Sequence, residues 1–558
     1  MTLRPQDAFL DFVLRCKSNG AIQGPACSFS FVEFVVSVCC RWSTIFLCLS
    51  VVKIVWQDEN VFSAMCEMRG CLCGSFFMSR NIYQEPLVSR YTSRDMQGLF
   101  SEKTKFTTWR KCWVALAEAQ YELGLTDIVK PEMVAQMKAN VDNIDYDLAA
   151  AKEKEIRHDV MAHVFEFGTK CPLAEGIIHL GATSQFVVCN TDLIIQKKAF
   201  ALIRSALLLV IRNLADFALK YKDLPTLGFT HYQPAQPTTV GKRNTLYIQD
   251  LVMDLEYIDS FMAQIKARGA KGTVGTQATF IELFKGDNQK VRDLDMLVAK
   301  KLGFSNVFAV TGQTYPRKLD TKLAETLAGI GGSAHKFAVD LRLLSNLKVQ
   351  EEPFAKHQTG SSAMAYKRNP MRSERMTGLA RKLMGLPADF AATFANQWFE
   401  RTLDDSAIRR MDIPQAFLLT DAILKLYINI TSQMVVFPKQ IERHLRMELP
   451  FMSTEKILME AVEKGESRQE MHEVIKEHSL AAGRVVKEEG GDNDLLQRLA
   501  NDPRMPFSMR DLQGLVGDYT QFTGRASAQT SEYIEEVVAP LLAARKHQMT
   551  EVDSSLSV

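Results

Sequence analysis

Apolar residues recur at helical spacing over most of the chain from about residue 85 onward. One set of six lies at intervals of two to four residues: Leu246, Ile248, Leu251, Leu255, Ile258 and Phe261. That interval is typical of a helix that buries one face. Proline, which would break a helix, is absent from residue 238 to residue 315. The pattern therefore predicts a long helix in this region.

Further long helical runs cover 193–219, 319–347, 372–396 and 413–436. Helices of about 25 to 30 residues span roughly 40 Å at 1.5 Å per residue, which is too long for a small compact domain. No segment has the repeated alternation of a strand, and the chain has no internal repeat. We therefore expect an all-α fold with an elongated central bundle of about five long helices.

The run at 193–219 is apolar on most of its circumference, so the bundle must bury that surface against something. Closed homo-oligomers are the common way to cover such a surface, and we expect self-association. The alternative is that flanking domains of the same chain cover it.

The composition is that of a large soluble protein. The chain has 558 residues, of which 46% are hydrophobic and 24% charged, and its length suggests two or three domains. Lys and Arg number 67 against 65 Asp and Glu, a formal charge of +2. This balance argues against a nucleic-acid-binding protein that relies on a broad basic field, while a local basic pocket remains compatible with it.

The first 84 residues differ from the rest and form an atypical extension. Eight of the 11 cysteines lie there, and Cys112, Cys171 and Cys189 are scattered without metal-site spacing, which favours a reducing, cytoplasmic location. Within the apolar stretch 27–56, the longest uncharged piece, 42–52, is shorter than the roughly 20 residues of a membrane helix. We interpret 1–84 as poorly structured or as a non-native leader, with Met65 or Met78 as alternative starts. A membrane or organelle anchor is the alternative interpretation.

Residues with chemical potential occur in the breaks between helices. The break at 360–370 contains Ser361, Ser362, Lys367 and Asn369, and its backbone amides precede a helix, where an anion is stabilised. Serine- and glycine-rich linkers are also common without any function. The break at 229–239 places His231 among Thr, Gln and two prolines that hold the segment open. A histidine is suited to general acid–base chemistry, although an isolated one is more often structural.

Three further segments are unusually polar: 181–184 with Asn190 and Thr191, 157–159 with His163, and 401–406 with Arg409 and Arg410. The first of these is equally explained by helix capping. The spacing of His158 and His163 does not match the H-E-x-x-H zinc pattern, so we predict no metal.

Together these segments resemble the fumarase/aspartase superfamily. Residues 360–370 match its signature Gly-Ser-Ser-x-Met-x-x-Lys-x-Asn-Pro, and 230–239 match its Thr-His-x-Gln-x-Ala-Gln-Pro-Thr-Thr region. Within the superfamily, 157–163, 311–315, 400–406 and 522–526 are similar to the adenylosuccinate lyase family. The resemblance runs from about residue 86 to about residue 542.

The resemblance implies three helical domains, at 85–182, 183–435 and 436–558, and a homotetramer whose active sites are shared between three subunits. It also implies a cofactor-free β-elimination of fumarate from two purine nucleotide substrates, adenylosuccinate and succinyl-aminoimidazole carboxamide ribotide. No nucleic acid or membrane partner is expected.

The resemblance also implies roles for individual residues. Ser361 would be the base, His231 the acid, Lys367 the neighbouring positive charge, and Glu374 the residue that orients His231. Asn369 would hold the substrate carboxylate. Five residues would surround the phosphate: Arg90, Tyr91, Arg401, Ser406 and Arg410. Seven would contact the base, ribose or succinyl group: Arg157, His158, Asp159, Thr183, Ser184, Gln313 and Arg375. Arg409 is expected to be an ordinary surface charge.

Two positions depart from the family pattern. Ala365 stands where the signature loop has proline, which frees a backbone φ angle and increases the entropy cost of closing the loop. Cys189 stands where an acidic residue is expected. Neither replaces a residue with a direct chemical role, so we expect lowered efficiency at most.

Other functions remain to be weighed. Argininosuccinate- or fumarate-specific enzymes belong to the same superfamily, but the phosphate-matching arginines argue against both. A catalytically weak member with a structural or scaffold role is the alternative from a different class, because fold alone does not fix function.

Overall fold

The computed structural model describes residues 81–355 and 357–550, so the predictions for residues 1–80 lie outside the described residues. The chain divides into two units between Gln84 and Glu85, and the candidate residues all belong to the second unit. The all-α prediction is confirmed for this unit, with two short two-stranded sheets in addition.

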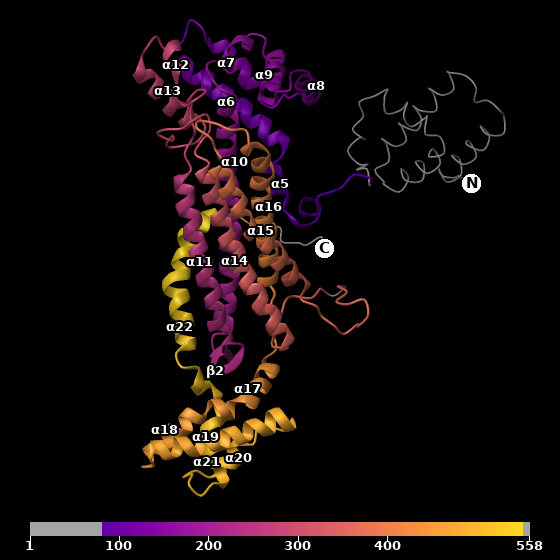
Figure 1. Cartoon of the computed structure of the whole chain (residues 1–558), viewed down its shortest axis with the longest axis vertical. Helices are drawn as coiled ribbons and strands as arrows, with labels where there is room; N and C mark the ends of the chain where they lie inside the picture. Colours follow the sequence, from indigo (N-terminus) through magenta and orange to yellow (C-terminus); the bar gives the residue numbers. More distant parts are fainter. Residues whose placement is uncertain (1–80, 356, 551–558) are drawn as a thin grey trace, which may run out of the picture. The chain divides into compact units, whose positions relative to one another are not determined.

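Five long helices form the predicted central bundle (Figure 1). They are α10 (Ser184–Lys220), α11 (Val240–Gln264), α14 (Lys318–Asn346), α15 (Met371–Ala395) and α16 (Asp405–Thr431). Two of them differ clearly from their predicted bounds: α10 begins nine residues before residue 193, and α16 differs at both ends. Helix α16 begins earlier and ends at Thr431, because Val435 and Val436 form a strand (β4) that pairs with β3 (Gln350–Glu351).

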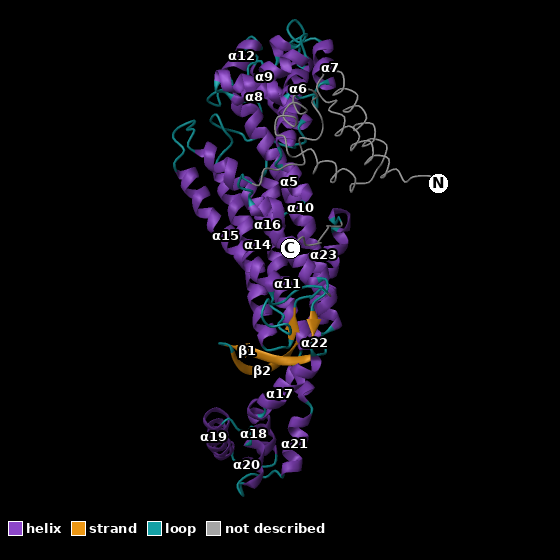
Figure 2. Cartoon of the chain, turned by 90° about the vertical axis from the view of Figure 1, so that its right-hand side faces the viewer, coloured by secondary structure: helices purple, strands orange, loops and turns teal. Residues whose placement is uncertain are grey.

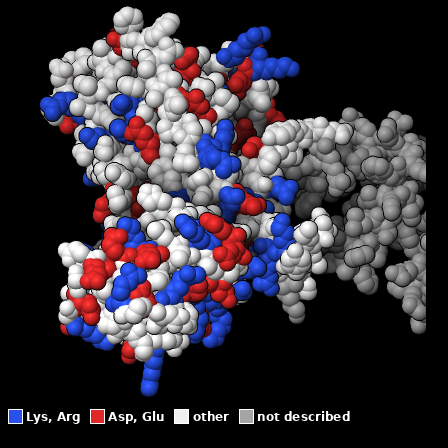
Figure 3. Space-filling view, turned by 60° about the horizontal axis from the view of Figure 1, so that its bottom comes forward, with Lys and Arg blue, Asp and Glu red and all other residues white. Residues whose placement is uncertain are grey.

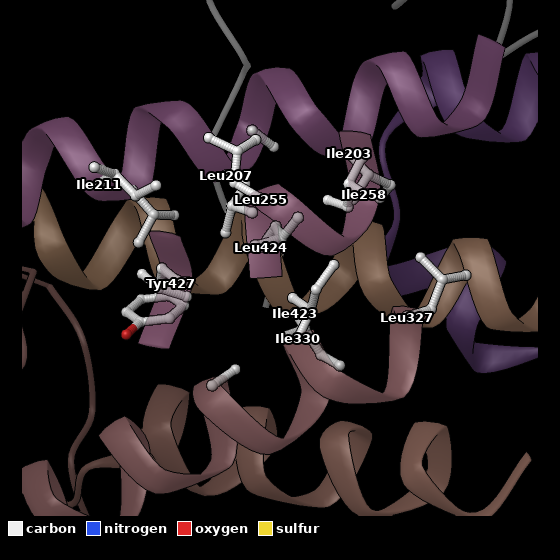
Figure 4. Packing of buried hydrophobic residues seen from close by; sticks show 14 of the residues in the cluster. Ile203, Leu207, Ile211, Leu255, Ile258, Leu327, Ile330, Ile423, Leu424 and Tyr427 are labelled. Carbon is white, nitrogen blue, oxygen red and sulfur yellow. The ribbon is translucent and has the colours of Figure 1, made fainter. Parts of the chain in front are cut away.

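The bundle core consists of aliphatic side chains that face one another from four helices. Figure 4 shows residues of α10, α11, α14 and α16 meeting in one layer. Ile211, Leu255 and Ile330 are fully buried there. At about 25 cal/mol per Å² of apolar surface removed from water, such side chains contribute roughly 1.5–3 kcal/mol each.

Two features of the bundle helices follow from this packing. Among the described residues, α16 is long and apolar enough to cross a membrane, but 72% of its most apolar window is buried, as expected for a core helix. On α11, five of the six predicted core residues are buried, whereas Leu246 is 51% exposed. The prediction that Leu246 faces the core is wrong, because it lies on the opposite face with Met253 and Tyr257.

The first two elements, η2 (Leu87–Tyr91) and α5 (Arg94–Leu99), pack Leu87 and Met96 into the bundle core. The N-terminal helices that follow them form a second core. They are α6 (Glu102–Glu122), α7 (Pro131–Ala139), α8 (Tyr146–Ile156), α9 (Asp159–Lys170) and η3 (Glu175–Ile177). Trp109 and Trp113 of α6 are buried in it. Two helices from later in the chain, α12 (Ala278–Leu283) and α13 (Asn288–Lys301), join the same core. The predicted domain boundaries stay a prediction.

The C-terminal helices form a third core and then return to the bundle. The first group is α17 (Pro438–Met452), α18 (Thr454–Glu463), α19 (Arg468–Arg484), η4 (Val485–Glu489), α20 (Leu495–Asn501), α21 (Met509–Gly517) and η5 (Tyr519–Thr523). The returning group is α22 (Ala526–Tyr533), η6 (Ile534–Val538), α23 (Ala539–Ala544) and η7 (Lys546–Gln548). Ile534 and Val538 pack into the bundle core.

A β-hairpin follows α10, formed by β1 (Pro225–Thr230) and β2 (Gln233–Thr239) (Figure 2). The prediction of an open, proline-held break at 229–239 is therefore wrong. Pro234 and Pro237 are accommodated because the sheet has only two strands, so a missing N–H on an outer edge costs no ladder bond.

The surface shown in Figure 3 mixes acidic and basic side chains over short distances, in keeping with the nearly equal numbers of the two kinds.

Candidate active site

One set of candidate residues gathers where α9 and α10 begin, and we call it the start group. Its members are Arg157, His158, Asp159, Thr183, Ser184, Gln313, Arg401, Ser406 and Arg410. Arg157 ends α8 in the left-handed conformation, with φ 54°, and His158 then caps α9. This turn exposes both side chains immediately beside the start of α10.

Hydrogen bonds connect members of the start group across long stretches of sequence. His158 Nδ1 accepts the Met161 N–H at 3.4 Å, and its Nε2 lies 3.2 Å from Ser184 Oγ. With Nδ1 as an acceptor, the proton of the neutral ring resides on Nε2 and is donated to Ser184. Gln313 Nε2 donates to Thr183 Oγ1 at 3.3 Å. Asp159 pairs with Arg410 at 2.9 Å.

A buried ion cluster holds Arg401 of the start group in place. Asp405 is fully buried and accepts from Arg317 Nε at 2.6 Å and from Arg401 Nη1 at 3.2 Å. The guanidinium of Arg401 is thereby held at the surface of the cluster, where it stays 17% exposed. Arg317 and Asp405 were not predicted as site residues, since nothing in the sequence indicates that positions 88 residues apart meet.

Arg409 corrects a prediction. It was expected at the surface, but it is 7% exposed and pairs with Asp320 at 2.8 Å and Asp192 at 2.9 Å. It also donates to the Tyr315 hydroxyl at 2.5 Å. Arg409 therefore ties α16 to α10 and α14, whereas its neighbour Arg410 points outward.

His163 is a packing residue. Its ring stacks on Phe106 at 3.8 Å between centroids and meets Trp109 edge-on. Burial, reinforced by Lys105 and Arg110, lowers the pKa of His163 to about 4, so the ring is neutral at physiological pH. No metal-ligand cluster of His, Cys, Asp and Glu occurs among the described residues.

Three candidates lie along the bundle. Arg90 and Tyr91 belong to the π-helical turn η2, which contacts α16. The guanidinium of Arg375, in the first turns of α15, lies 5.2 Å from the centre of the Tyr91 ring. The structure therefore brings Arg375 and Tyr91 together although 284 positions separate them in the sequence.

The signature loop, residues 352–370, connects β3 to α15 and carries Ser361, Lys367 and Asn369. Ser361 Oγ accepts the backbone N–H of Ala363 at 3.3 Å and of Met364 at 3.2 Å. Asn369 Nδ2 donates to the Gly360 carbonyl at 2.8 Å and so joins the two ends of the segment 360–369. Lys367 and Glu374 are exposed. The loop amides thus surround the one oxygen that the resemblance designates as the base.

His231 occupies the tip of the hairpin. It and Tyr232 form a two-residue turn in which both residues have positive φ, 52° and 57°. Such a turn favours Asn-Gly, and each side chain held in this region costs about 1–3 kcal/mol. His231 is exposed and makes no hydrogen bond within the described chain. Strain retained at an exposed histidine is typical of a functional position.

The hairpin and the signature loop emerge at the same end of the bundle. Leu347 and Val349, which lead into the loop, line a small cavity together with Leu227 and Phe229 of β1. We call His231, Ser361, Lys367, Asn369 and Glu374 the end group. The hairpin follows the far end of α10, whose 37 residues at about 1.5 Å each span roughly 55 Å, so the length of this helix lies between His231 and the start group.

A larger cavity lies elsewhere. It has a volume of about 380 Å³ and is lined by α6, α10 and the ends of α7 and α13, including Lys111 and Lys198. None of the predicted site residues contributes to it.

Comparisons with known proteins identify the family. A family model described as "Lyase" matches residues 91–385, and one described as "Adenylosuccinate lyase C-terminus" matches residues 450–533. The adenylosuccinate lyase of Schizosaccharomyces pombe is 52% identical over 478 residues, which cover 85% of this chain and 99% of that protein. That of Saccharomyces cerevisiae is 52% identical over 458 residues, covering 82% and 95%.

Solved structures agree on the fold. The 3-carboxy-cis,cis-muconate lactonizing enzyme from Pseudomonas putida has a TM-score of 0.71 at 22% identity, covering 80% of this chain and 98% of its own. A fumarate lyase from Mesorhizobium sp. BNC1 has a TM-score of 0.69 at 21% identity, covering 82% and 99%. With half of the chain matched by the lyase model and two relatives above 50% identity, the chain belongs to the adenylosuccinate lyase family.

Proposed function

We propose that the protein is a carbon–nitrogen lyase that eliminates fumarate from adenylosuccinate, giving AMP, and from succinyl-aminoimidazole carboxamide ribotide. The observation that carries the proposal is the pair of loop amides directed at Ser361 Oγ, at 3.3 and 3.2 Å. The relatives named adenylosuccinate lyase support the substrate class.

The reaction begins with removal of a proton from the carbon beside a succinyl carboxylate. A serine hydroxyl is a very weak base and must act as the alkoxide. The N–H groups of Ala363 and Met364 stabilise negative charge on its oxygen, as donors in an oxyanion hole do. The exposed ammonium of Lys367 adds positive charge once the loop closes and water leaves. Ser361 thereby becomes a competent base in the closed state.

The C–N bond then breaks, and its electron pair passes to the leaving nitrogen. His231 donates a proton to that nitrogen, so the proton lost from carbon is matched by one gained at nitrogen and the products are fumarate and a neutral amine. Glu374 orients the ring of His231 for this donation. Asn369 and neighbouring loop amides bind the carboxylate that gains charge during the first step.

The start group is suited to the nucleotide. Arg401 and Arg410 present guanidinium groups to solvent, and Ser406 adds a hydroxyl. The paired N–H groups of a guanidinium match the geometry of phosphate oxygens. In this proposal Arg90 and Tyr91 complete the phosphate site. Arg157, His158, Asp159, Thr183, Ser184, Gln313 and Arg375 contact the base, ribose or succinyl group.

We further propose that the protein is a homotetramer in which the start group of one copy meets the end group of another. The length of α10, roughly 55 Å, lies between the hairpin and the start group in one chain, so a second copy is needed to bring His231 to a substrate held by the start group. Exposed apolar side chains offer the contact surface. Leu246, Met253 and Tyr257 form a stripe on α11, exposed by 51%, 46% and 61%. Phe399, beside the start group, is fully exposed.

A cytoplasmic location belongs to the same proposal. The three cysteines of the described residues, Cys112, Cys171 and Cys189, are free and buried, which fits a reducing compartment. No cofactor enters the proposed steps.

Absorbance on adding the purified chain to adenylosuccinate tests the function, with fumarate and AMP identified chromatographically. Equimolar products, lost in Ser361→Ala and in His231→Ala, are expected. Near-normal turnover in either variant would withdraw that residue's role. A folded tetramer that releases no product from either succinyl substrate would favour the scaffold alternative.

A further inference from the structure

We propose that Glu352 is a positioning residue that clamps the two ends of the signature loop together and sets the start of α15. The inference rests on the proposed function for its effect on catalysis, whereas its geometry is independent of that function. Glu352 directly follows β3, at the entrance of the loop, and its partners lie at the exit, about 20 positions later.

The carboxylate of Glu352 accepts three hydrogen bonds from the first turn of α15. Oε1 accepts the Arg372 N–H at 3.0 Å, and Oε2 accepts both the N–H and the hydroxyl of Ser373 at 2.8 Å. Glu352 is 5% exposed and Ser373 fully buried. These are strong, charge-assisted bonds in a site shielded from water.

Helix α15 depends on this contact because it has no side-chain cap of its own. The residue before the helix is Pro370, which has no side-chain oxygen to accept the free N–H groups of the first turn. Glu352 satisfies two of them and places a negative charge at the positive end of the helix dipole. A cap supplied from 18 positions away ties a distant strand to the helix start, which an ordinary local cap would not do.

Additional contacts join the segments that enter and leave the loop, nearer to Ser361. Arg372 Nη2 donates to Gln358 Oε1 at 3.2 Å, and Asn369 Nδ2 donates to the Gly360 carbonyl at 2.8 Å. Gly360 itself packs against the Lys367 carbonyl so closely that a Cβ would lie 2.1 Å from it. Contacts therefore join the entering and leaving segments of the loop at several positions, and those of Glu352 are the most buried.

The clamp fixes groups that the reaction uses. Glu374 and Arg375 follow Ser373 directly, and Asn369 lies just before the helix start. A shift of α15 moves all of them relative to Ser361, and misplacement by about 1 Å can cost on the order of 100-fold in rate. Glu352 touches none of the reacting atoms in this scheme, so its contribution to the rate is entirely through position.

Glu352→Gln tests the clamp, because the amide keeps the size of the side chain and turns an N–H group toward the Arg372 N–H. We expect kcat to fall at least tenfold, with KM changing less than threefold. The matched control is Asp511→Asn. Asp511 accepts from the N–H and hydroxyl of Ser508 at 2.8 and 2.7 Å, at the start of a helix in the C-terminal core. The control should leave kcat unchanged.

Limited trypsin digestion supplies a readout that does not need activity. Cleavage after the exposed Lys367 or Arg368 should be at least fivefold faster in Glu352→Gln than in the wild type and in Asp511→Asn. Unchanged kcat together with unchanged cleavage would overturn the proposal. If wild-type protein lacks lyase activity, the proposed function fails while the digestion still tests the clamp.

Ser373→Ala covers the case in which Glu352→Gln does not fold. It removes one of the three donors, so a threefold or greater loss of kcat with faster loop cleavage is expected. A Ser373→Ala enzyme that is indistinguishable from wild type in both measurements would overturn the clamp.

Discussion

A buried, partly unsatisfied carboxylate in the bundle gives the sharpest prediction about stability. Asp254 of α11 is 6% exposed, and its Oδ2 has no hydrogen-bond partner among the described residues. Burial, opposed by a hydrogen bond with Ser333 and assisted by the nearby charge of Asp250, raises the pKa of Asp254 from 3.8 to about 6. The ionised carboxylate therefore destabilises the fold at neutral pH, and Asp254→Asn should remove that penalty.

The magnitude follows from linkage. Between about pH 4 and pH 6 the folded chain keeps a proton that the unfolded chain has lost, so stability falls as the pH rises through this window. A shift of about two units corresponds to roughly 3 kcal/mol above pH 7 and to about half of that at pH 5. With an unfolding entropy of about 2.1 cal/mol/K per residue over this unit, 3 kcal/mol raises Tm by about 3 °C.

Thermal denaturation at pH 5 and pH 8 measures the effect, with Asp216→Asn, an exposed carboxylate on α10, as the control. We expect Asp254→Asn to raise Tm by about 3 °C at pH 8 and by about half as much at pH 5. Asp216→Asn should change Tm at neither pH. A lower Tm for Asp254→Asn at pH 8, or a pH-independent difference, would refute the reasoning.

Three further substitutions test separate parts of the account. Ala365→Pro fixes a backbone φ angle and should lower the free-energy cost of closing the signature loop by about 0.4–1 kcal/mol. Proline is tolerated there because the Ala365 N–H makes no hydrogen bond among the described residues. We expect kcat to rise about two- to fivefold, and a lowered kcat would contradict this prediction. Cys189→Asp should raise Tm by about 2 °C, because its carboxylate would give two buried arginines a negative partner. The side chain of Arg268 is fully buried and hydrogen-bonds only to carbonyl groups among the described residues, and Arg317 Nη2 contacts Cys189 Sγ at 3.9 Å. A fall in Tm would contradict this prediction. Glu166→Gln should destabilise by about 3–5 kcal/mol, because it leaves the buried Arg110 without its ion-pair partner, and a calorimetric Tm equal to wild type would count against that.

The long helices could be predicted from the sequence because periodicity reports directly on burial. The same signal was misleading at Leu246, because α11 carries apolar residues on two faces and periodicity alone does not tell which of them is buried in the bundle. The hairpin was missed because two prolines resemble a break, and because His231 and Tyr232 hold a turn that usually needs Asn-Gly.

The motifs located most candidate residues but not their surroundings. Arg409 was expected at the surface because adjacent charges usually are, whereas its partners Asp192 and Asp320 come from two other helices. Glu352 gave no signal, and Asp405 lay in a segment noted only as polar, since the roles of both come from contacts between distant positions. Nor could the sequence tell which candidates share one end of the bundle, because that depends on the direction of each helix.

Recovery of activity from two inactive variants tests whether one active site is built from two copies of the chain. His158→Ala damages the start group and His231→Ala the end group, and each alone should abolish elimination of fumarate from adenylosuccinate. After the two proteins are mixed and their subunits exchanged, about one quarter of the sites combine two intact groups if the groups come from different copies. We predict recovery of about one quarter of wild-type activity. A mixture that exchanges subunits but stays inactive would contradict a site shared between copies.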